Sequence, residues 1–202
     1  MSSLSDSVGG ATLNGTGYSF TYDMFCDPKG ALYVNKSVNL KAPTDVYFSD
    51  DFTLIVWINL MTWVNSTPFV FFGNPNNSVS DVIWLGLGNS TQLKAKLYYN
   101  STLSSEINTG SVIPNLNQWY HVAYVLKGSN LSIFVNGVLK GNGTTVYVPR
   151  NVNRTTNYIG MSNDAVFGEI KLYQIALSSV QILSDYTAIS GIYNNCSGNL
   201  II

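Results

Sequence analysis

Residues 119–141 constrain the fold more than any other part of the chain. In an extended backbone successive side chains point to opposite faces, and both faces of residues 119–126 are then largely apolar. Such a strand is expected inside a sandwich of two sheets. A first turn is predicted at 127–129, and Asn136 and Gly137 supply the two positive-φ residues of a type I′ turn. The stretch therefore predicts consecutive antiparallel hairpins.

The rest of the chain also shows short apolar runs separated by turns rich in glycine and asparagine. This pattern favours a β-sandwich over a parallel sheet covered by helices. One helix is predicted from Ser179 to Tyr186, because Ser178 and Gln181 form a capping box. The predicted fold class is all-β, an antiparallel two-sheet sandwich with one short C-terminal helix. The further strands are predicted at 17–22, 31–34, 37–40, 52–60, 68–73, 82–87, 93–99, 157–161 and 165–176.

Four motifs follow one another along the chain, at 30–58, 119–123, 134–137 and 157–178. In this order they resemble the opening strands, central hairpins and closing strands of laminin G-like domains, in their concanavalin A-like jelly-roll branch. Trp-x-His-Val-Ala and Tyr-Val-Asn-Gly recur in the central hairpins of that family. The resemblance implies a jelly-roll sandwich over nearly the whole chain.

Length and composition indicate one domain without a nucleic-acid or membrane partner. The 202 residues fit a single all-β domain, predicted over 16–202 after a flexible leader at 1–15. The net charge is −1 and the only arginines are Arg150 and Arg154, so no basic stripe is available to neutralise a phosphate backbone. The longest apolar run, 52–64, is interrupted by polar residues and is too short to span a bilayer. Neither nucleic-acid binding nor membrane insertion is expected.

Asparagine acceptor patterns for glycosylation are frequent. Asn-x-Ser/Thr occurs ten times, and only 10% of residues are charged. We therefore expect an extracellular, cell-surface or virion-surface glycoprotein, although an Asn-rich surface also produces such patterns incidentally. Residues 1–10 lack the basic and apolar segments of a secretory signal, so a signal elsewhere or a route such as virion assembly is expected. The sites predicted in or beside turns are Asn65, Asn76, Asn89, Asn100, Asn142 and Asn153, and the others are Asn14, Asn35, Asn130 and Asn195.

The two cysteines, Cys26 and Cys196, flank the domain. In jelly-roll folds the first and last strands usually neighbour one another, so a disulfide between these cysteines is predicted. Two free buried thiols are the alternative.

Catalysis is not expected. Glucanases that resemble this sandwich cleave with two glutamates on one strand, whereas this chain has only Glu106 and Glu169, far apart in sequence. His121 is the only histidine and lies in an apolar strand, which favours a structural, hydrogen-bonded residue. We therefore predict a protein that is not an enzyme and has no catalytic residues.

No cofactor is predicted, although calcium remains open because many laminin G-like domains bind it at the sandwich rim. Candidate donors are Asn163, Asp164 and Asp81. The family often carries Asp-Asp where this chain has Gly168 and Glu169, so one acidic position is missing.

Surface recognition is the remaining function. The predicted protein is a non-catalytic extracellular recognition or adhesion module that binds a glycan or a surface protein. The alternative is a structural surface glycoprotein, such as a viral coat or filament subunit, that uses the sandwich for self-association. Aromatic side chains can cover the apolar faces of sugars, but core packing is the competing role for each. The candidates are Tyr98, Tyr99, Tyr147, Trp63 and Trp84.

Overall fold

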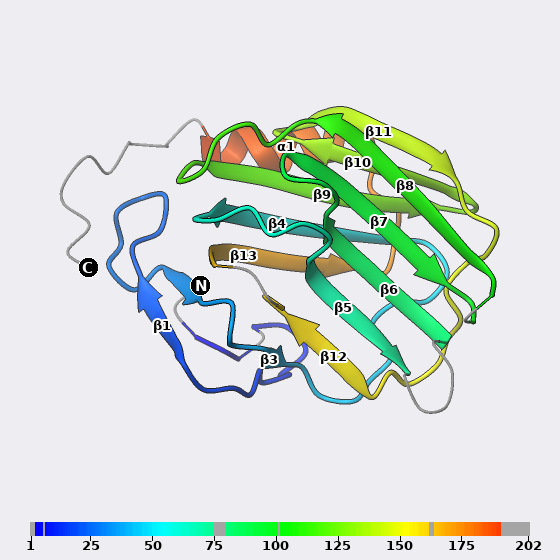
Figure 1. Ribbon diagram of the computed structural model, residues 1–202, viewed down its shortest axis with the longest axis horizontal. Coiled ribbons are helices and arrows are strands. Elements are labelled where there is room, and N and C mark those ends of the chain that lie inside the picture. Colours follow the sequence, from blue (N-terminus) through cyan, green and yellow to red (C-terminus); the bar gives the residue numbers. More distant parts are fainter. Residues whose placement is uncertain (1–2, 6, 75–79, 101, 162–163, 191–202) are drawn as a thin grey trace.

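Two antiparallel sheets lie face to face in the computed structural model, with the six-stranded sheet in front in Figure 1. The structure describes residues 3–5, 7–74, 80–100, 102–161 and 164–190. The predicted all-β sandwich with one short helix is confirmed. The seven-stranded sheet has the order β1 (Tyr18–Thr21), β2 (Ala31–Val34), β13 (Ala165–Tyr173), β4 (Phe52–Leu60), β9 (Trp119–Lys127), β10 (Asn130–Val135) and β11 (Val138–Thr144). The six-stranded sheet has the order β3 (Leu40–Lys41), β12 (Thr156–Ile159), β5 (Pro68–Asn74), β6 (Ser80–Leu87), β7 (Gln92–Tyr98) and β8 (Ser104–Ser111).

The core lies between the two sheets and is organised around β4, which pairs with β13 on one side and β9 on the other. Alternate residues of β4, the strand predicted at 52–60, all lie in this core: Phe52, Leu54, Val56, Ile58 and Leu60. The hydroxyl of Tyr124 on β9 reaches across the sandwich and donates to the carbonyl of Gly86 on β6 at 3.3 Å. Burial raises the pKa of this hydroxyl well above its usual value.

The two predicted turns are present. The hairpin between β9 and β10 pairs Lys127 with Asn130, and the next pairs Val135 with Val138. Asn136 has φ 51° and Gly137 has φ 76°, as a type I′ turn requires. One face of β9 lies in the core and the other faces the helix. The alternation predicted the two apolar faces, but not that the helix covers one of them.

The helix α1 (Ser179–Ser190) covers the outer face of the seven-stranded sheet, and it is longer than predicted. Its only fully buried side chain is Ile182, which packs in a second cluster with Ile55, Ala123 and Phe134. The capping box is confirmed, because the Ser178 amide donates to Gln181 Oε1 at 2.9 Å and the Gln181 amide donates to Ser178 Oγ at 3.3 Å. No helix in the described part of the chain is long and apolar enough to cross a membrane.

Several strand predictions were wrong at their ends. The strand predicted at 37–40 begins only at Leu40, because the amide of Ser37 bonds the Asn35 side chain at 2.8 Å in a turn. The strand predicted at 165–176 ends at Tyr173. β8 was missed altogether, because its sequence Ser-Ser-Glu-Ile-Asn-Thr-Gly-Ser carries only one large apolar residue.

The N-terminal segment reaches the edge of the six-stranded sheet. The amide of Asn14 donates to the carbonyl of Lys41 at 2.8 Å, and the amide of Lys41 donates back at 2.7 Å. The flexible leader at 1–15 and the single domain at 16–202 remain predictions.

Candidate binding face on the six-stranded sheet

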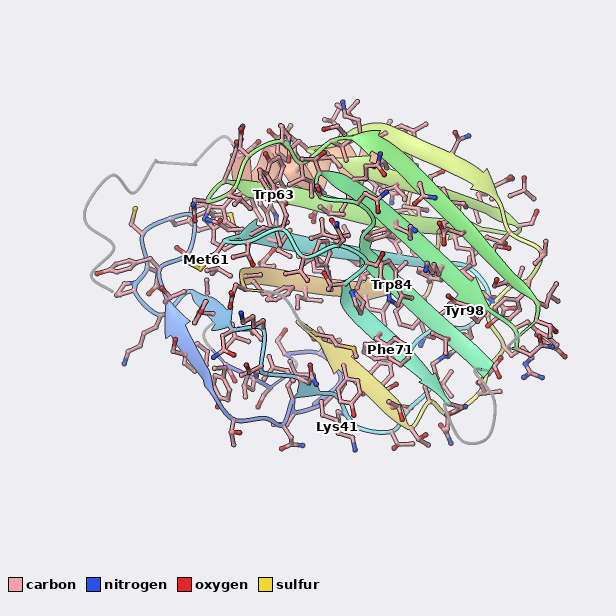
Figure 2. The ribbon with its side chains drawn as sticks, in the orientation of Figure 1. Lys41, Met61, Trp63, Phe71, Trp84 and Tyr98 are labelled. Carbon is pink, nitrogen blue, oxygen red and sulfur yellow. The ribbon has the colours of Figure 1, made fainter. Side chains whose placement is uncertain are left out.

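One row of side chains crosses the outer face of the six-stranded sheet from edge to edge. Residues directly opposite one another on paired strands share a face, and the register places one outward residue of each strand in line. Figure 2 shows Lys41, Phe71 and Trp84 along this line. We call it the cross-strand row, and it consists of Lys41, Tyr158, Phe71, Trp84, Lys96 and Glu106.

The row is outward because the neighbours of its members along each strand are core residues. On β5, Val70 and Phe72 point inward on either side of Phe71. On β6, Ile83 and Leu85 do the same for Trp84. Alternation then leaves three aromatic rings, on β12, β5 and β6, side by side on the outer face.

The aromatic members differ in exposure. Phe71 and Tyr158 are half-buried, whereas Trp84 is only 8% exposed. One reason is that the ammonium of Lys96 on the next strand lies 5.3 Å from the centroid of the Trp84 ring. The open part of the aromatic surface is therefore formed by Phe71 and Tyr158.

The other end of the row is a charged cluster around Glu106. Lys94 Nζ lies 2.7 Å from Glu106 Oε1, and Lys96 Nζ lies 3.4 Å from Glu106 Oε2. Asn108 Nδ2 also donates to Glu106 Oε1 at 3.0 Å. Burial opposes ionisation, but the hydrogen bonds from Lys94 and Asn108 and the charges of both lysines outweigh it and lower the pKa of Glu106 to about 2. Glu106 is therefore an ionised acceptor at neutral pH.

The structure separates the five aromatic candidates. Trp84 and Tyr98 lie on the outer face of the six-stranded sheet, and Trp63 is 40% exposed in the loop between β4 and β5 (Figure 2). Tyr99 and Tyr147 instead form an edge-to-face pair with ring centroids 5.5 Å apart, and Tyr147 is buried.

Sequence reasoning missed Phe71, Tyr158 and the three lysines of this face. The alternation within each strand gave a partial signal, because it separates outward from inward residues. The line itself depends on the register between strands.

The two calcium candidates that the structure describes, Asp81 and Asp164, are bound to other protein groups. Both carboxylate oxygens of Asp81 accept from Arg150, at 2.8 Å and 2.6 Å. Asp164 Oδ1 accepts from the amide of Lys36 at 3.0 Å, and Asn163 lies outside the described residues. Within the described ranges, no group of three or more His, Cys, Asp or Glu side chains could hold a metal ion.

Arg154 also contacts Asp81, through the main-chain carbonyl of Asp81, and has a structural role. Its side chain is fully buried, and it donates to the carbonyls of Asp81 at 2.8 Å and Phe48 at 2.7 Å. Burial lowers the pKa of this guanidinium, against the attraction of Tyr147 and Asp81. The arginine thus links β6 to the loop before β4.

The two glutamates lie on different sheets, because Glu106 is on β8 and Glu169 is on β13. Glu169 Oε2 lies 2.7 Å from Lys171 Nζ. His121 is fully buried with its Nε2 atom 3.1 Å from Asp185 Oδ2, as expected for a structural residue, but its Nδ1 atom has no hydrogen-bond partner within the described part of the chain.

Most predicted glycosylation sites that the structure describes lie in turns or loops. Asn65, Asn89 and Asn153 are exposed there, and Asn100 caps a turn by accepting from the amide of Leu103 at 2.8 Å. Asn142 was misplaced by the sequence analysis, because it lies within β11. Asn76 and Asn195 lie outside the described residues. Glycan attachment at any of these sites remains a prediction.

Cys26 lies in the loop between β1 and β2, with φ 68°. Its predicted partner, Cys196, lies outside the described residues. The bridge between them remains a prediction.

The sandwich and the motifs agree with a family model. Residues 14–183 match the model described as the concanavalin A-like lectin/glucanases superfamily, in its laminin G-like branch. The chain belongs to this superfamily, and the predicted family is confirmed. A search of curated proteins found no match.

Solved structures share the fold at low sequence identity. Domain 4 of AbnA, a GH43 extracellular arabinanase from Geobacillus stearothermophilus, solved with arabinotriose, has a TM-score of 0.68 at 19% identity, over 90% of this chain and 92% of that chain. The binding domain of botulinum neurotoxin DC, solved with SialylT, has a TM-score of 0.70 at 16% identity, over 91% of this chain and 48% of that chain. A sialidase from Trypanosoma rangeli has a TM-score of 0.59 at 19% identity, over 82% of this chain and 28% of that chain. This chain spans about half of the neurotoxin binding domain, and these identities show the fold alone.

Proposed function

We propose that this protein is a non-catalytic glycan-binding module that holds its ligand on the cross-strand row. The observation that carries this proposal is the line of three aromatic rings, Tyr158, Phe71 and Trp84, on neighbouring strands of one outer face. Apolar side chains aligned on an outer face do not serve the core between the sheets. Aromatic faces of this kind cover the C–H faces of sugar rings.

The polar end of the row supplies the second requirement of a sugar site. Glu106 accepts hydrogen bonds, whereas the ammonium groups of Lys94 and Lys96 and the amide of Asn108 donate them. Sugar hydroxyls both donate and accept, so this cluster can bind them in either role.

The comparisons support a glycan as the ligand. The arabinanase domain was solved with arabinotriose and the neurotoxin domain with SialylT, and both share this sandwich over most of the present chain. The superfamily also includes enzymes, so absence of catalysis is part of the proposal.

The chemistry of Glu106 argues against hydrolysis at this face. A retaining glycosidase needs one carboxylic acid with a raised pKa beside a second carboxylate about 5 Å away. The pKa of Glu106 is lowered to about 2, and it is the single carboxylate in the row. It cannot donate a proton at neutral pH.

We further propose that the protein acts outside the cell. Ten acceptor asparagines and a surface with few charges support this location. Peptide mapping of natively produced protein tests it, and unmodified asparagine at all ten sites would contradict it.

One observation favours the alternative of a self-associating surface protein. Val138 and Leu139 on the edge strand β11 are 52% and 49% exposed. Size-exclusion chromatography with light scattering, without any glycan, distinguishes the two functions. A glycan-binding monomer supports recognition, and a stable oligomer without ligand supports assembly.

A glycan array followed by calorimetric titration tests the binding face. Phe71→Ala and Tyr158→Ala should each weaken binding of the ligand found by at least tenfold. Tyr22→Ala is the matched control, because Tyr22 is 50% exposed just after β1 of the other sheet. If Tyr22→Ala loses binding and Phe71→Ala keeps it, the glycan site does not lie on the cross-strand row.

A further inference from the structure

We propose that the cross-strand row selects glycans carrying acidic groups, carboxylate or sulfate, and that Lys41 and Lys96 receive these groups at the two ends of its aromatic part. This inference rests on the proposed function and adds the class of ligand. It depends on the charges of the face and on the position of Lys96 over Trp84.

The outer face is positively charged although the protein is not. Three lysines point outward from the six-stranded sheet: Lys41, Lys94 and Lys96. Their three positive charges exceed the one negative charge of Glu106. The whole chain has a net charge of −1. The neighbouring Asp81 and Arg150 neutralise one another in a bidentate ion pair. The lysines therefore give this face a local excess of positive charge that attracts anions.

The lysines stand at the ends of the aromatic surface. Lys41 lies opposite Tyr158, and Lys96 lies opposite Trp84. Four strand spacings separate β3 from β7, which corresponds to roughly 19 Å between the backbones. A short oligosaccharide lying on Tyr158 and Phe71 would thus have an ammonium group within reach at either end.

Lys41 is available for such a contact. Its side chain is exposed at the edge of the sheet, and it forms no ion pair within the described part of the chain. An acidic group on the ligand would be its first charged partner there.

Lys96 lies farther from the carboxylate of Glu106 than Lys94 does. Its ammonium lies 3.4 Å from Glu106, compared with 2.7 Å for Lys94, and it covers the ring of Trp84. An acidic group can attract this ammonium away from Trp84 and so expose the ring to the sugar. A neutral glycan provides no charge to move it, so Trp84 stays covered.

Three oligosaccharides of matched length test this preference by calorimetry. Keratan sulfate carries sulfates without carboxylates, its desulfated form carries no charge, and hyaluronan carries carboxylates only. We expect at least one acidic probe to bind ten times more tightly than the uncharged one, with the difference shrinking as salt is raised. Comparison of the two acidic probes identifies the acidic group.

Lysine variants locate the effect. Lys41→Gln and Lys96→Gln should each weaken the acidic probe about fivefold, as expected for one partly exposed charge pair, and should affect the uncharged probe less, because no ion pair is lost there. Glu106→Gln should strengthen the acidic probe, because it removes the competing carboxylate. Lys140→Gln is the control, because Lys140 is exposed on β11 of the other sheet. Thermal unfolding of each variant confirms that it is folded.

The outcomes separate this inference from the proposed function. Equal affinity for charged and uncharged probes, or no effect of either lysine variant, overturns the acidic preference. If Phe71→Ala still weakens binding at least tenfold in that case, the glycan-binding face stands. If none of the probes binds, the acidic preference is wrong for both acid classes, and the glycan array then decides the proposed function.

Discussion

The Nε2 atom of His121 on β9 lies 3.1 Å from a carboxylate oxygen of Asp185 on α1. The second oxygen of Asp185 accepts from Lys171 Nζ on β13 at 2.9 Å. One carboxylate thus joins the helix to two strands of the seven-stranded sheet. The hydrogen bond from His121, together with Lys171 and against the effect of burial, lowers the pKa of Asp185.

Replacing this carboxylate should loosen the helix. Asp185→Asn is expected to lower the free energy of unfolding by about 1 to 3 kcal/mol, because it removes a charge-assisted bond and leaves Lys171 partly uncompensated. Urea unfolding measures the change. Glu169→Gln is the control, since Glu169 also binds Lys171 but its side chain is 49% exposed, and its loss should cost less than about 1 kcal/mol. Equal effects of the two variants would contradict the role given to Asp185.

The helix also depends on one apolar residue. Ile182 is fully buried against the outer face of the sheet, so Ile182→Ala should cost about 2 to 4 kcal/mol of stability through the cavity that it leaves. Val180 on the same helix is 74% exposed, and Val180→Ala should change stability by less than about 0.5 kcal/mol. Chemical denaturation of both variants tests the difference, and a small effect at Ile182 would show that the helix is not docked as described.

The two hairpin turns allow a matched glycine comparison. Gly137→Ala should cost about 2 to 3 kcal/mol, because φ is 76° and the added Cβ would lie 2.7 Å from Leu183 Cδ1. Gly128→Ala should cost only about 1 kcal/mol, because φ is 56° and no heavy atom lies within 4 Å of the new Cβ. The difference in thermal unfolding between the two variants reports the contact with the helix. If the two cost the same, that contact is absent in solution.

Glu106 should contribute to acid stability. Because its pKa is lowered from 4.5 to about 2, the bound carboxylate stabilises the folded state above pH 4.5, and this stabilisation is lost as pH falls toward 2. Glu106→Gln should therefore lose less stability than the wild type between pH 5 and pH 2. Urea midpoints across this range test the sign. Parallel curves for the two proteins would mean that Glu106 is not bound by its lysines.

The predicted bridge between Cys26 and Cys196 gives a further test. If it forms, both cysteines of the denatured but unreduced protein resist alkylation, and intact mass shows this directly. Reduction should then lower the unfolding free energy by roughly 2 to 5 kcal/mol. Full alkylation without reduction would show two free thiols.

The sequence by itself determined the strands whose side chains alternate. β4 and β9 were predicted as strands because they are almost continuously apolar, and the assignment of their side chains to two faces follows from a period of two, which is a local property of the chain. The turn at Asn136 and Gly137 was equally local, because its backbone angles depend on those two residues. β8 lacked such a pattern and was missed, since only its pairing with β7 makes it a strand.

The tertiary structure alone decided the binding face. Lys41, Phe71 and Lys96 belong to three strands far apart in the sequence, and they fall in one line only because the strands pair in a particular order and register. The partners of His121 and Asp81 were likewise set by pairing and packing between distant segments. Alternation tells which side of its own strand a residue faces, whereas hydrogen bonding between strands decides which residues stand beside it.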